Sequence, residues 1–359
     1  MGSIRFVLAL AVYFAHFPAP GGIKIIGGMQ AVQLFFICSG FYMCLTLPSY
    51  QSIRQFYISR FIRLYPPYIL ILVLSIGLFW FFKKYAALTF EKYPLNNLTD
   101  ILYLAFANLF IITQDFVFFI KYDVGNLVLS GKMWTTKPEP YNYLFVPQAW
   151  SLALELYFYI LVPFLFKLKA RYIMLLCGLS YCVRIYTYKF GVHFDPWTGR
   201  FFPSELAFFL MGMLSFHLMS QIKNISDKRV IYAGLIFVFL WIIYFFVYRH
   251  FKIIGNLWGL NYKLYGGYLL FSLTIPFMFL ATKKSTVDRF LGQLSFPIFI
   301  SHFLTNAVAT PLISPWFGKA WPKILLVVVV SIAMHYLVIE PLEKYRNRLK
   351  NAQTQDQFL

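Results

Sequence analysis

The chain has 359 residues, of which 60% are hydrophobic and only 13% are charged, and its formal net charge is +19. Soluble domains are roughly half apolar and about a quarter charged, so this composition excludes an ordinary soluble protein and predicts a polytopic membrane protein. The basic residues stand in short clusters between apolar runs, without the continuous stripe that nucleic-acid binding needs. Such clusters suit anionic lipid headgroups, and arginines inside a helix bundle can bind an anionic ligand.

The first apolar run, IRFVLALAVYFAHF, places Arg5 eleven positions before His16. Eleven residues make roughly three helical turns, so both side chains should share one helix face, about 16 Å apart. We expect His16 to be buried in a protein cavity as a general base, and Arg5 to orient its surroundings or bind an anionic donor. The alternatives are a signal peptide, or a structural histidine with a snorkelling arginine.

We predict an all-α bundle of about ten spans with both termini cytoplasmic. Residues 1–340 form one transmembrane domain, in which 83–149 is extracytoplasmic and its short apolar piece 101–112 is re-entrant or interfacial. Residues 341–359 are a cytoplasmic tail. The four cysteines lie in apolar runs without metal-ligand spacing, so we expect core residues and no metal site. The predicted spans are roughly 4–18, 29–48, 64–82, 150–166, 172–189, 201–219, 230–248, 264–282, 290–308 and 323–340.

A second basic pair, Arg60 and Arg63, stands in SIRQFYISRFIRLYPPY. Residues three apart share a helix face, and two guanidiniums there can bind phosphate oxygens bidentately. Arg54 would extend this patch. We expect Pro66 and Pro67 to begin a new helix. Ordinary anchoring of the helix at the membrane surface is the alternative.

Glu155 is the single acidic residue of the predicted span 150–166, in AWSLALELYFY. An unpaired buried carboxylate is costly, so Glu155 should be paired with an arginine or with His16, either functionally or to fix packing. Ser151 and Tyr159 lie four residues to either side, on the same helix face.

Other polar or small residues near the ends of spans are weaker candidates. Ser39 and Gly40, in FFICSGF, favour close helix packing. Arg200, with Glu205 nearby, and His302 could contact a substrate, although a structural role is the alternative for both.

These motifs occur in a specific order: R-x10-H, FFICSGF, FYISRFIRLYPPY, WSLALELYFY, and LGQLSFPIFISHF followed by IEPL. Together they resemble the membrane acyltransferase-3 family over the chain from Arg5 to Pro341. The resemblance implies transfer of an acetyl or related acyl group from cytoplasmic acyl-CoA to a hydroxyl of a cell-surface or lipid-linked saccharide. It implies a donor substrate and membrane lipid as partners, and no metal.

The resemblance also implies roles for individual residues. His16 would be the catalytic base or a transient acyl carrier, Glu155 the membrane-embedded acid, and Arg5, Arg60 and Arg63 the donor contacts. Leu156 stands where the family often has a second acidic residue, which argues against a two-carboxylate mechanism. We expect a stand-alone form without a fused hydrolase-like domain.

Aromatic residues of the same stretch complete the predicted site. Trp150 and Tyr157 would stack on a sugar ring, beside Ser151. Buried Arg, Glu and His would also serve a transporter or flippase for a lipid-linked saccharide, or a non-catalytic assembly partner. Binding of acyl-CoA distinguishes the enzyme from the transporter.

Overall fold

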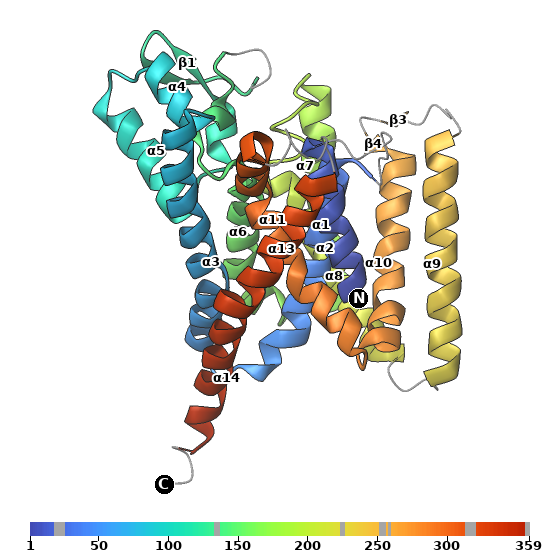
Figure 1. The fold of residues 1–359 in the computed structure, drawn as a ribbon. Coiled ribbons are helices and arrows are strands. Elements are labelled where there is room, and N and C mark those ends of the chain that lie inside the picture. The colour runs from blue at the N-terminus through green and yellow to red at the C-terminus, as the bar shows by residue number, and fades with distance from the viewer. Residues whose placement is uncertain are drawn as a thin grey trace. The chain divides into compact units, whose positions relative to one another are not determined.

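The computed structural model describes residues 1–17, 26–132, 137–222, 227–250, 256–257, 260–312 and 321–355. Residue 18 of the first predicted span, 133–136 of the region 83–149, and 356–359 of the predicted tail lie outside the described residues. The described chain is mostly helical, with two short antiparallel strand pairs (Figure 1). This agrees with the predicted class of helical membrane protein.

The elements follow one another along the chain within these bounds. They are α1 (Gly2–His16), α2 (Gly28–Thr46), η2 (Leu47–Ser49), α3 (Ile53–Phe82), α4 (Ala86–Lys92), α5 (Leu98–Phe110), η3 (Phe116–Phe119), β1 (Ile120–Asp123), β2 (Asn126–Leu129), η5 (Pro140–Tyr143), η6 (Pro147–Ala149), α6 (Trp150–Leu165), α7 (Ala170–Lys189), α8 (Phe202–Ile222), α9 (Asp227–His250), β3 (Asn256–Leu257), β4 (Leu260–Asn261), α10 (Tyr262–Thr282), α11 (Thr286–Leu312), α13 (Trp321–Met334), the π-helix η7 (His335–Ile339) and α14 (Glu340–Gln355).

Six described segments are long and apolar enough to cross a membrane, judged by length and composition. The predicted segment 4–18 falls on the shorter helix α1, and 172–189, 230–248 and 290–308 are helical, but none of these four is among the six, so the number of about ten spans stays a prediction. The six segments are Gly28–Ser49, Ile53–Phe82, Pro147–Leu165, Phe202–Ile222, Leu264–Thr282 and Trp321–Arg348.

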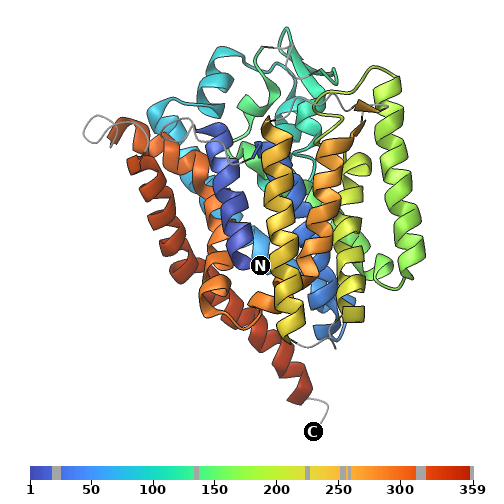
Figure 2. The same ribbon diagram turned by 90° about the vertical axis from the view of Figure 1, so that its right-hand side faces the viewer.

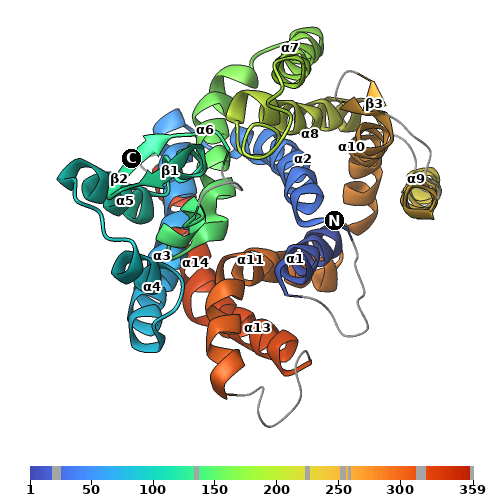
Figure 3. The ribbon, with the colours of Figure 1, turned by 90° about the horizontal axis from the view of Figure 1, so that it is seen from above.

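The chain divides into two compact units, each assembled from separate stretches. Unit 1 comprises Met1–Leu8, Met29–Pro48 and Ile160–Gly292, and unit 2 comprises Ala9–Gly28, Ser49–Tyr159 and Gln293–Leu359. In unit 1, α7 packs beside α8, and α10 packs on both α8 and α9 (Figures 2 and 3).

Glycine brings α2 and α8 into close contact within unit 1. A Cβ added at Gly40 would meet the carbonyl oxygen of Phe209 far inside van der Waals distance, and one at Gly212 would do the same with Ile37. The predicted packing role of FFICSGF is therefore confirmed for Gly40, because only a residue without a side chain lets the two backbones approach so closely.

In unit 2, α3 is one continuous helix, so the prediction that Pro66 and Pro67 begin a new helix is wrong. Each proline removes an N–H donor, but in membrane helices neighbouring groups satisfy the freed carbonyls and the helix continues. Ser52 caps the N-terminus by accepting a hydrogen bond from the N–H of Gln55, and Lys83 ends the helix in the left-handed region.

Small elements gather at the Phe82 end of α3 (Figure 1). Helix α5 has 13 residues and rises only about 20 Å, which is too short to cross a bilayer core of about 30 Å. Its re-entrant or interfacial position stays a prediction. Strands β1 and β2 are joined by Val124 and Gly125, both with positive φ, as a two-residue hairpin turn requires.

Two further expectations differ from the structure. The predicted tail continues the last helix: α14 runs to Gln355 and packs along α3, with Arg346 only 8% exposed. Cys182 is exposed and not in the core, whereas Cys38, Cys44 and Cys177 are buried. Cys182 lies on α7, which packs on α8 within unit 1.

The close approach of α2 and α8 predicts a specific sensitivity. Gly40→Ala should destabilise the protein by about 1–3 kcal/mol, because the added methyl group overpacks a backbone contact. Gly77→Ala, on an exposed face of α3 where a Cβ meets nothing within 4 Å, is the matched control and should be neutral or slightly stabilising. Thermal unfolding in detergent measures both. Equal melting temperatures would contradict the packing argument.

Candidate functional site

Two histidines of unit 2 lie against each other. The ring of His16, at the end of α1, stacks on that of His302 in α11, with 5.5 Å between centroids and 26° between planes. His302 is only 1% exposed. The expected burial of His16 is wrong: its side chain is exposed, at the last residue of α1. Helix α1 is unbroken from Gly2, which confirms that Arg5 and His16 belong to one helix.

Aromatic rings surround this pair, which we call the imidazole pair (His16 and His302). Phe303 lies 4.8 Å from each imidazole, and Tyr13 and Phe17 contact His302 at 6.5 and 6.2 Å between centroids. These rings shield His302 from water, which strengthens electrostatic interactions at its imidazole.

The tautomer of His302 follows from its hydrogen bond. Its Nδ1 lies 2.6 Å from the carbonyl oxygen of Phe299, which only accepts, so Nδ1 carries the proton and Nε2 is an acceptor. A hydrogen bond also fixes the orientation of the Gln148 side-chain amide, because its Nε2 donates to the carbonyl of Ile300 at 2.7 Å. Neither His302 Nε2 nor Gln148 Oε1 has a hydrogen-bond partner among the described residues, and both atoms are buried. Two buried acceptors thus lie close together along α11, where donors such as hydroxyl groups would satisfy them.

A second group of polar residues joins α3 to α14. Arg60 is 3% exposed and donates to the hydroxyl of Tyr50, which lies 2.9 Å from the hydroxyl of Ser59. Arg346 Nε donates to that same Ser59 oxygen at 3.0 Å. The guanidinium of Arg60 also lies over the ring of Phe56, 5.5 Å from its centroid.

Arg63 lies beside the carboxylates of this region. It interacts electrostatically with Glu155 and Glu343, and Tyr159 is hydrogen-bonded to Glu155. The expected pairing of Glu155 with an arginine is therefore present. Three guanidiniums face two carboxylates here among the described residues, so positive charge is in excess and an anion would be stabilised. The three guanidiniums, of Arg60, Arg63 and Arg346, are called the basic cluster below.

Helices α6 and α11 both run between the basic cluster and the imidazole pair, so the helical rise gives the separation between them. Gln148, just before α6, bonds to α11 beside His302, whereas Tyr159 of α6 lies at Arg60 and Arg63. On α11, Gln293 donates to Glu343 at 3.3 Å, and His302 follows nine residues later. Nine helical residues rise about 14 Å, and Trp150 to Tyr159 on α6 is also nine residues. The basic cluster and the imidazole pair are therefore about 14 Å apart along the helices.

Three predicted site residues lie elsewhere. Arg54 is exposed in the first turn of α3. Arg5 belongs to unit 1, where its guanidinium lies 5.4 Å from the ring centroid of Tyr42. Arg200, also in unit 1, forms an ion pair with Asp195. The roles predicted for these arginines stay predictions.

The aromatic residues predicted to hold a sugar make protein contacts. Trp150 is buried against Phe118, and Ser151 donates to the carbonyl of Gln148 at 3.4 Å. Tyr157 donates to Asp115 at 2.9 Å and accepts from the N–H of Thr113 at 3.1 Å. These contacts tie the segment 111–119 to α6, and the predicted contacts with a saccharide stay predictions.

Several residues of these groups escaped the sequence analysis. The sequence contained a signal for Arg346. Glu343 and Arg346 are three residues apart in the last polar stretch, so a helix there places both side chains on one face. Gln148 gave no signal, since it precedes the motif that drew attention to Trp150. In unit 1, Glu205 pairs with Arg184 and accepts from Gln33 at 3.2 Å, a contact across 172 residues of chain that no local pattern reveals.

The sequence as a whole is similar to known proteins. A family model described as an acyltransferase domain matches residues 2–340. A protein of Aquifex aeolicus (strain VF5), described as uncharacterized, is 24% identical over 214 residues, which are 57% of this chain and 89% of that protein. No solved structure matches the chain.

Asp115, outside the candidate spans, should make stability depend on pH. Burial raises the pKa of its carboxyl to about 6, although the hydrogen bond from Tyr157 opposes this. Between the ordinary pKa near 3.8 and about 6, the folded protein keeps a proton that the unfolded chain releases. Stability should therefore fall as pH rises through this window, by at most about 1.4 kcal/mol per pH unit, and level off above it.

Asp115→Asn should flatten this dependence. Melting temperatures between pH 4 and 7 in detergent measure it, and Asp123→Asn, at an exposed carboxylate, is the control. An unchanged slope in Asp115→Asn would show that Asp115 does not titrate in this range.

Proposed function

The chain belongs to the acyltransferase-3 family of membrane proteins, and from this premise we propose that it transfers an acyl group, acetyl in the simplest case, from cytoplasmic acyl-CoA to a hydroxyl of a cell-surface or lipid-linked saccharide. The observation that carries the proposal is the pairing of a basic cluster with an imidazole pair about 14 Å further along α6 and α11. The extended pantetheine arm of coenzyme A spans a similar distance.

In this proposal the basic cluster binds the phosphates of the donor. Arg63 is partly exposed, whereas Arg60 and Arg346 are buried and interact electrostatically with it, so a phosphate approaching Arg63 meets positive charge in excess. Guanidinium forks bind phosphate oxygens bidentately, and Glu155 and Tyr159 hold Arg63 in place from α6.

The transfer step takes place at the imidazole pair. His16 removes the proton of the acceptor hydroxyl while its oxygen attacks the thioester carbonyl, forming the C–O bond. The tetrahedral intermediate then breaks the C–S bond, and the coenzyme A thiolate leaves and takes the proton from His16. Gln148 Oε1 and His302 Nε2 would accept hydrogen bonds from further hydroxyls. A saccharide offers several such hydroxyls, so these two acceptors are compatible with a saccharide acceptor, as they are with the amide N–H groups of the pantetheine arm.

Removing charge from the basic cluster should weaken donor binding. Arg60→Gln combined with Arg63→Gln should raise the Kd for acetyl-CoA by at least about tenfold, because each charge-assisted contact contributes roughly 1.5–3 kcal/mol. Arg171→Gln, an exposed arginine outside the cluster, is the control. Calorimetry on purified protein measures the Kd. If the unaltered protein binds no acyl-CoA, the alternative of a saccharide transporter or flippase is favoured.

Loss of the base should abolish transfer without affecting donor binding. His16→Ala should lower the rate of acyl transfer by about 10²–10⁴-fold, the usual contribution of a general base, while the Kd for acyl-CoA stays unchanged. His193→Ala, at an exposed histidine of unit 1, is the control. Mass spectrometry of surface glycans, scoring the mass added per sugar, is the readout in cells. Full activity of His16→Ala would refute this mechanism.

A further inference from the structure

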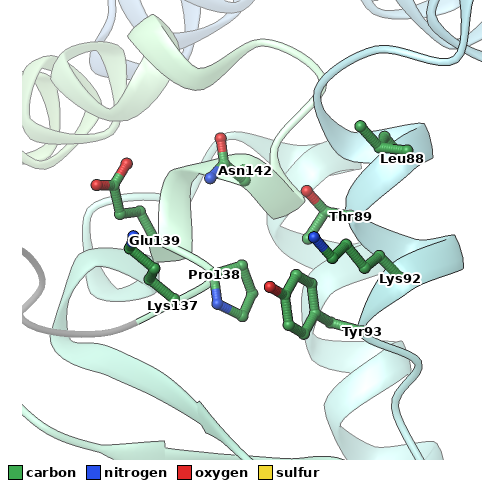
Figure 4. A pocket seen from close by; sticks show the side chains of 8 residues that line it. All are labelled: Leu88, Thr89, Lys92, Tyr93, Lys137, Pro138, Glu139 and Asn142. Carbon is green, nitrogen blue, oxygen red and sulfur yellow. The ribbon is translucent and has the colours of Figure 1, made fainter.

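A cavity of about 300 Å³ lies between α4 and the segment that leads into η5, both in unit 2 (Figure 4). This is about the volume of ten water molecules, and thus room for roughly one sugar ring. Its lining residues are Leu88, Thr89, Lys92, Tyr93, Lys137, Pro138, Glu139 and Asn142.

The lining combines the groups that hold a polyol. Thr89, Asn142 and Glu139 offer a hydroxyl, an amide and a carboxylate, while Leu88, Pro138 and the ring of Tyr93 offer apolar surface. Figure 4 shows the hydroxyl of Thr89 and the amino group of Lys92 turned toward the same space. With Lys137 there are two ammonium groups against one carboxylate, so the cavity favours a ligand that carries negative charge.

Protein contacts hold the two walls of the cavity together. The hydroxyl of Tyr143, in η5, donates to the carbonyl of Tyr93, which ends α4, at 3.2 Å. The N–H of Asn142 donates to the carbonyl of Glu139 at 2.9 Å, and Pro138 is buried. A ligand therefore meets a largely preformed site and loses little free energy to ordering it.

Helix α4 connects this cavity to the imidazole pair. Tyr85, which precedes α4, contacts Phe303 with 6.1 Å between ring centroids, and Phe303 contacts both imidazoles. Thr89 lies one turn further, since its N–H donates to the carbonyl of Tyr85 at 3.0 Å. One turn rises about 5–6 Å, so the cavity lies a short distance beyond the imidazoles.

We propose that this cavity is a saccharide subsite, which binds an acidic sugar residue of the acceptor while a hydroxyl elsewhere on the same acceptor lies at the imidazole pair. The inference rests on the proposed function and names its substrate class: a hydroxyl-rich saccharide that carries a carboxylate or a phosphate. The subsite binds a sugar unit of the acceptor that does not itself react. It therefore contributes to acceptor binding and not to the chemical step.

The test uses the purified full-length protein in detergent and three probes: tetragalacturonate, neutral maltotetraose and inorganic phosphate. Calorimetry should show tetragalacturonate binding at least about tenfold more tightly than maltotetraose. Lys92→Gln with Asn142→Ala should remove this preference and weaken tetragalacturonate by about tenfold or more. Lys121→Gln, a charge removal on β1 outside the cavity, should leave both unchanged. Melting temperatures confirm that the variants are folded.

Three results would overturn the subsite: no binding of either tetrasaccharide, equal binding of the two, or binding that the double variant leaves unchanged. Phosphate that displaces tetragalacturonate completely at equal concentration would also overturn it, since the lysines would then bind any anion. Acetyl-CoA titrated into the same samples separates the two proposals. Donor binding without saccharide binding refutes the subsite alone, whereas absence of donor binding refutes the proposed function.

Discussion

A guanidinium group buried in an apolar helix bundle needs hydrogen-bond acceptors or negative charges around it. The arrangement of polar residues in unit 2 depends on how this need is met. Arg60 and Arg346 share the hydroxyl network of Tyr50 and Ser59, and Arg63 is balanced by Glu155 and Glu343. The bond from Arg346 to Ser59 and the interactions of Arg63 with Glu155 and Glu343 join elements that are distant in sequence. The compensation therefore holds α3, α6 and α14 in register, and its unbalanced positive charge defines the place where an anion gains most.

Helix α6 links this cluster to the imidazole pair. Polar residues contact neighbouring helices at two positions along it. Gln148 lies just before the first turn, and Glu155 and Tyr159 lie about one to three turns further along the helix. Gln148 fixes the helix against α11, and Glu155 fixes it against α3. A helix held at both positions sets a constant distance between the basic cluster and the imidazole pair, and in the proposed function it would fix the donor's phosphates relative to the reacting carbonyl.

Two kinds of feature could be predicted from the sequence: those that follow from residue spacing within one helix, and those that follow from the free-energy cost of burying charge. The pairing of Arg60 with Arg63, the need of Glu155 for an arginine, and the close packing at Gly40 are of these kinds. Contacts between distant segments were not accessible. Arg346 joins Ser59 across 287 residues, and Gln148 joins Ile300 across 152. The two prolines of α3 misled the analysis, because local propensity was overridden by the surroundings of the helix.

The stacking of His16 on His302 has a consequence for proton transfer. The two rings lie 5.5 Å apart, and only His302 is buried, so the exposed His16 is the ring that a hydroxyl from outside can approach. The proton on His302 Nδ1 is already bound to the carbonyl of Phe299, which leaves its Nε2 as an acceptor. In the proposed mechanism, a proton taken by His16 from an acceptor hydroxyl is held beside this oriented neighbour. It can be released as soon as a stronger base appears, and the leaving thiolate of the donor is such a base.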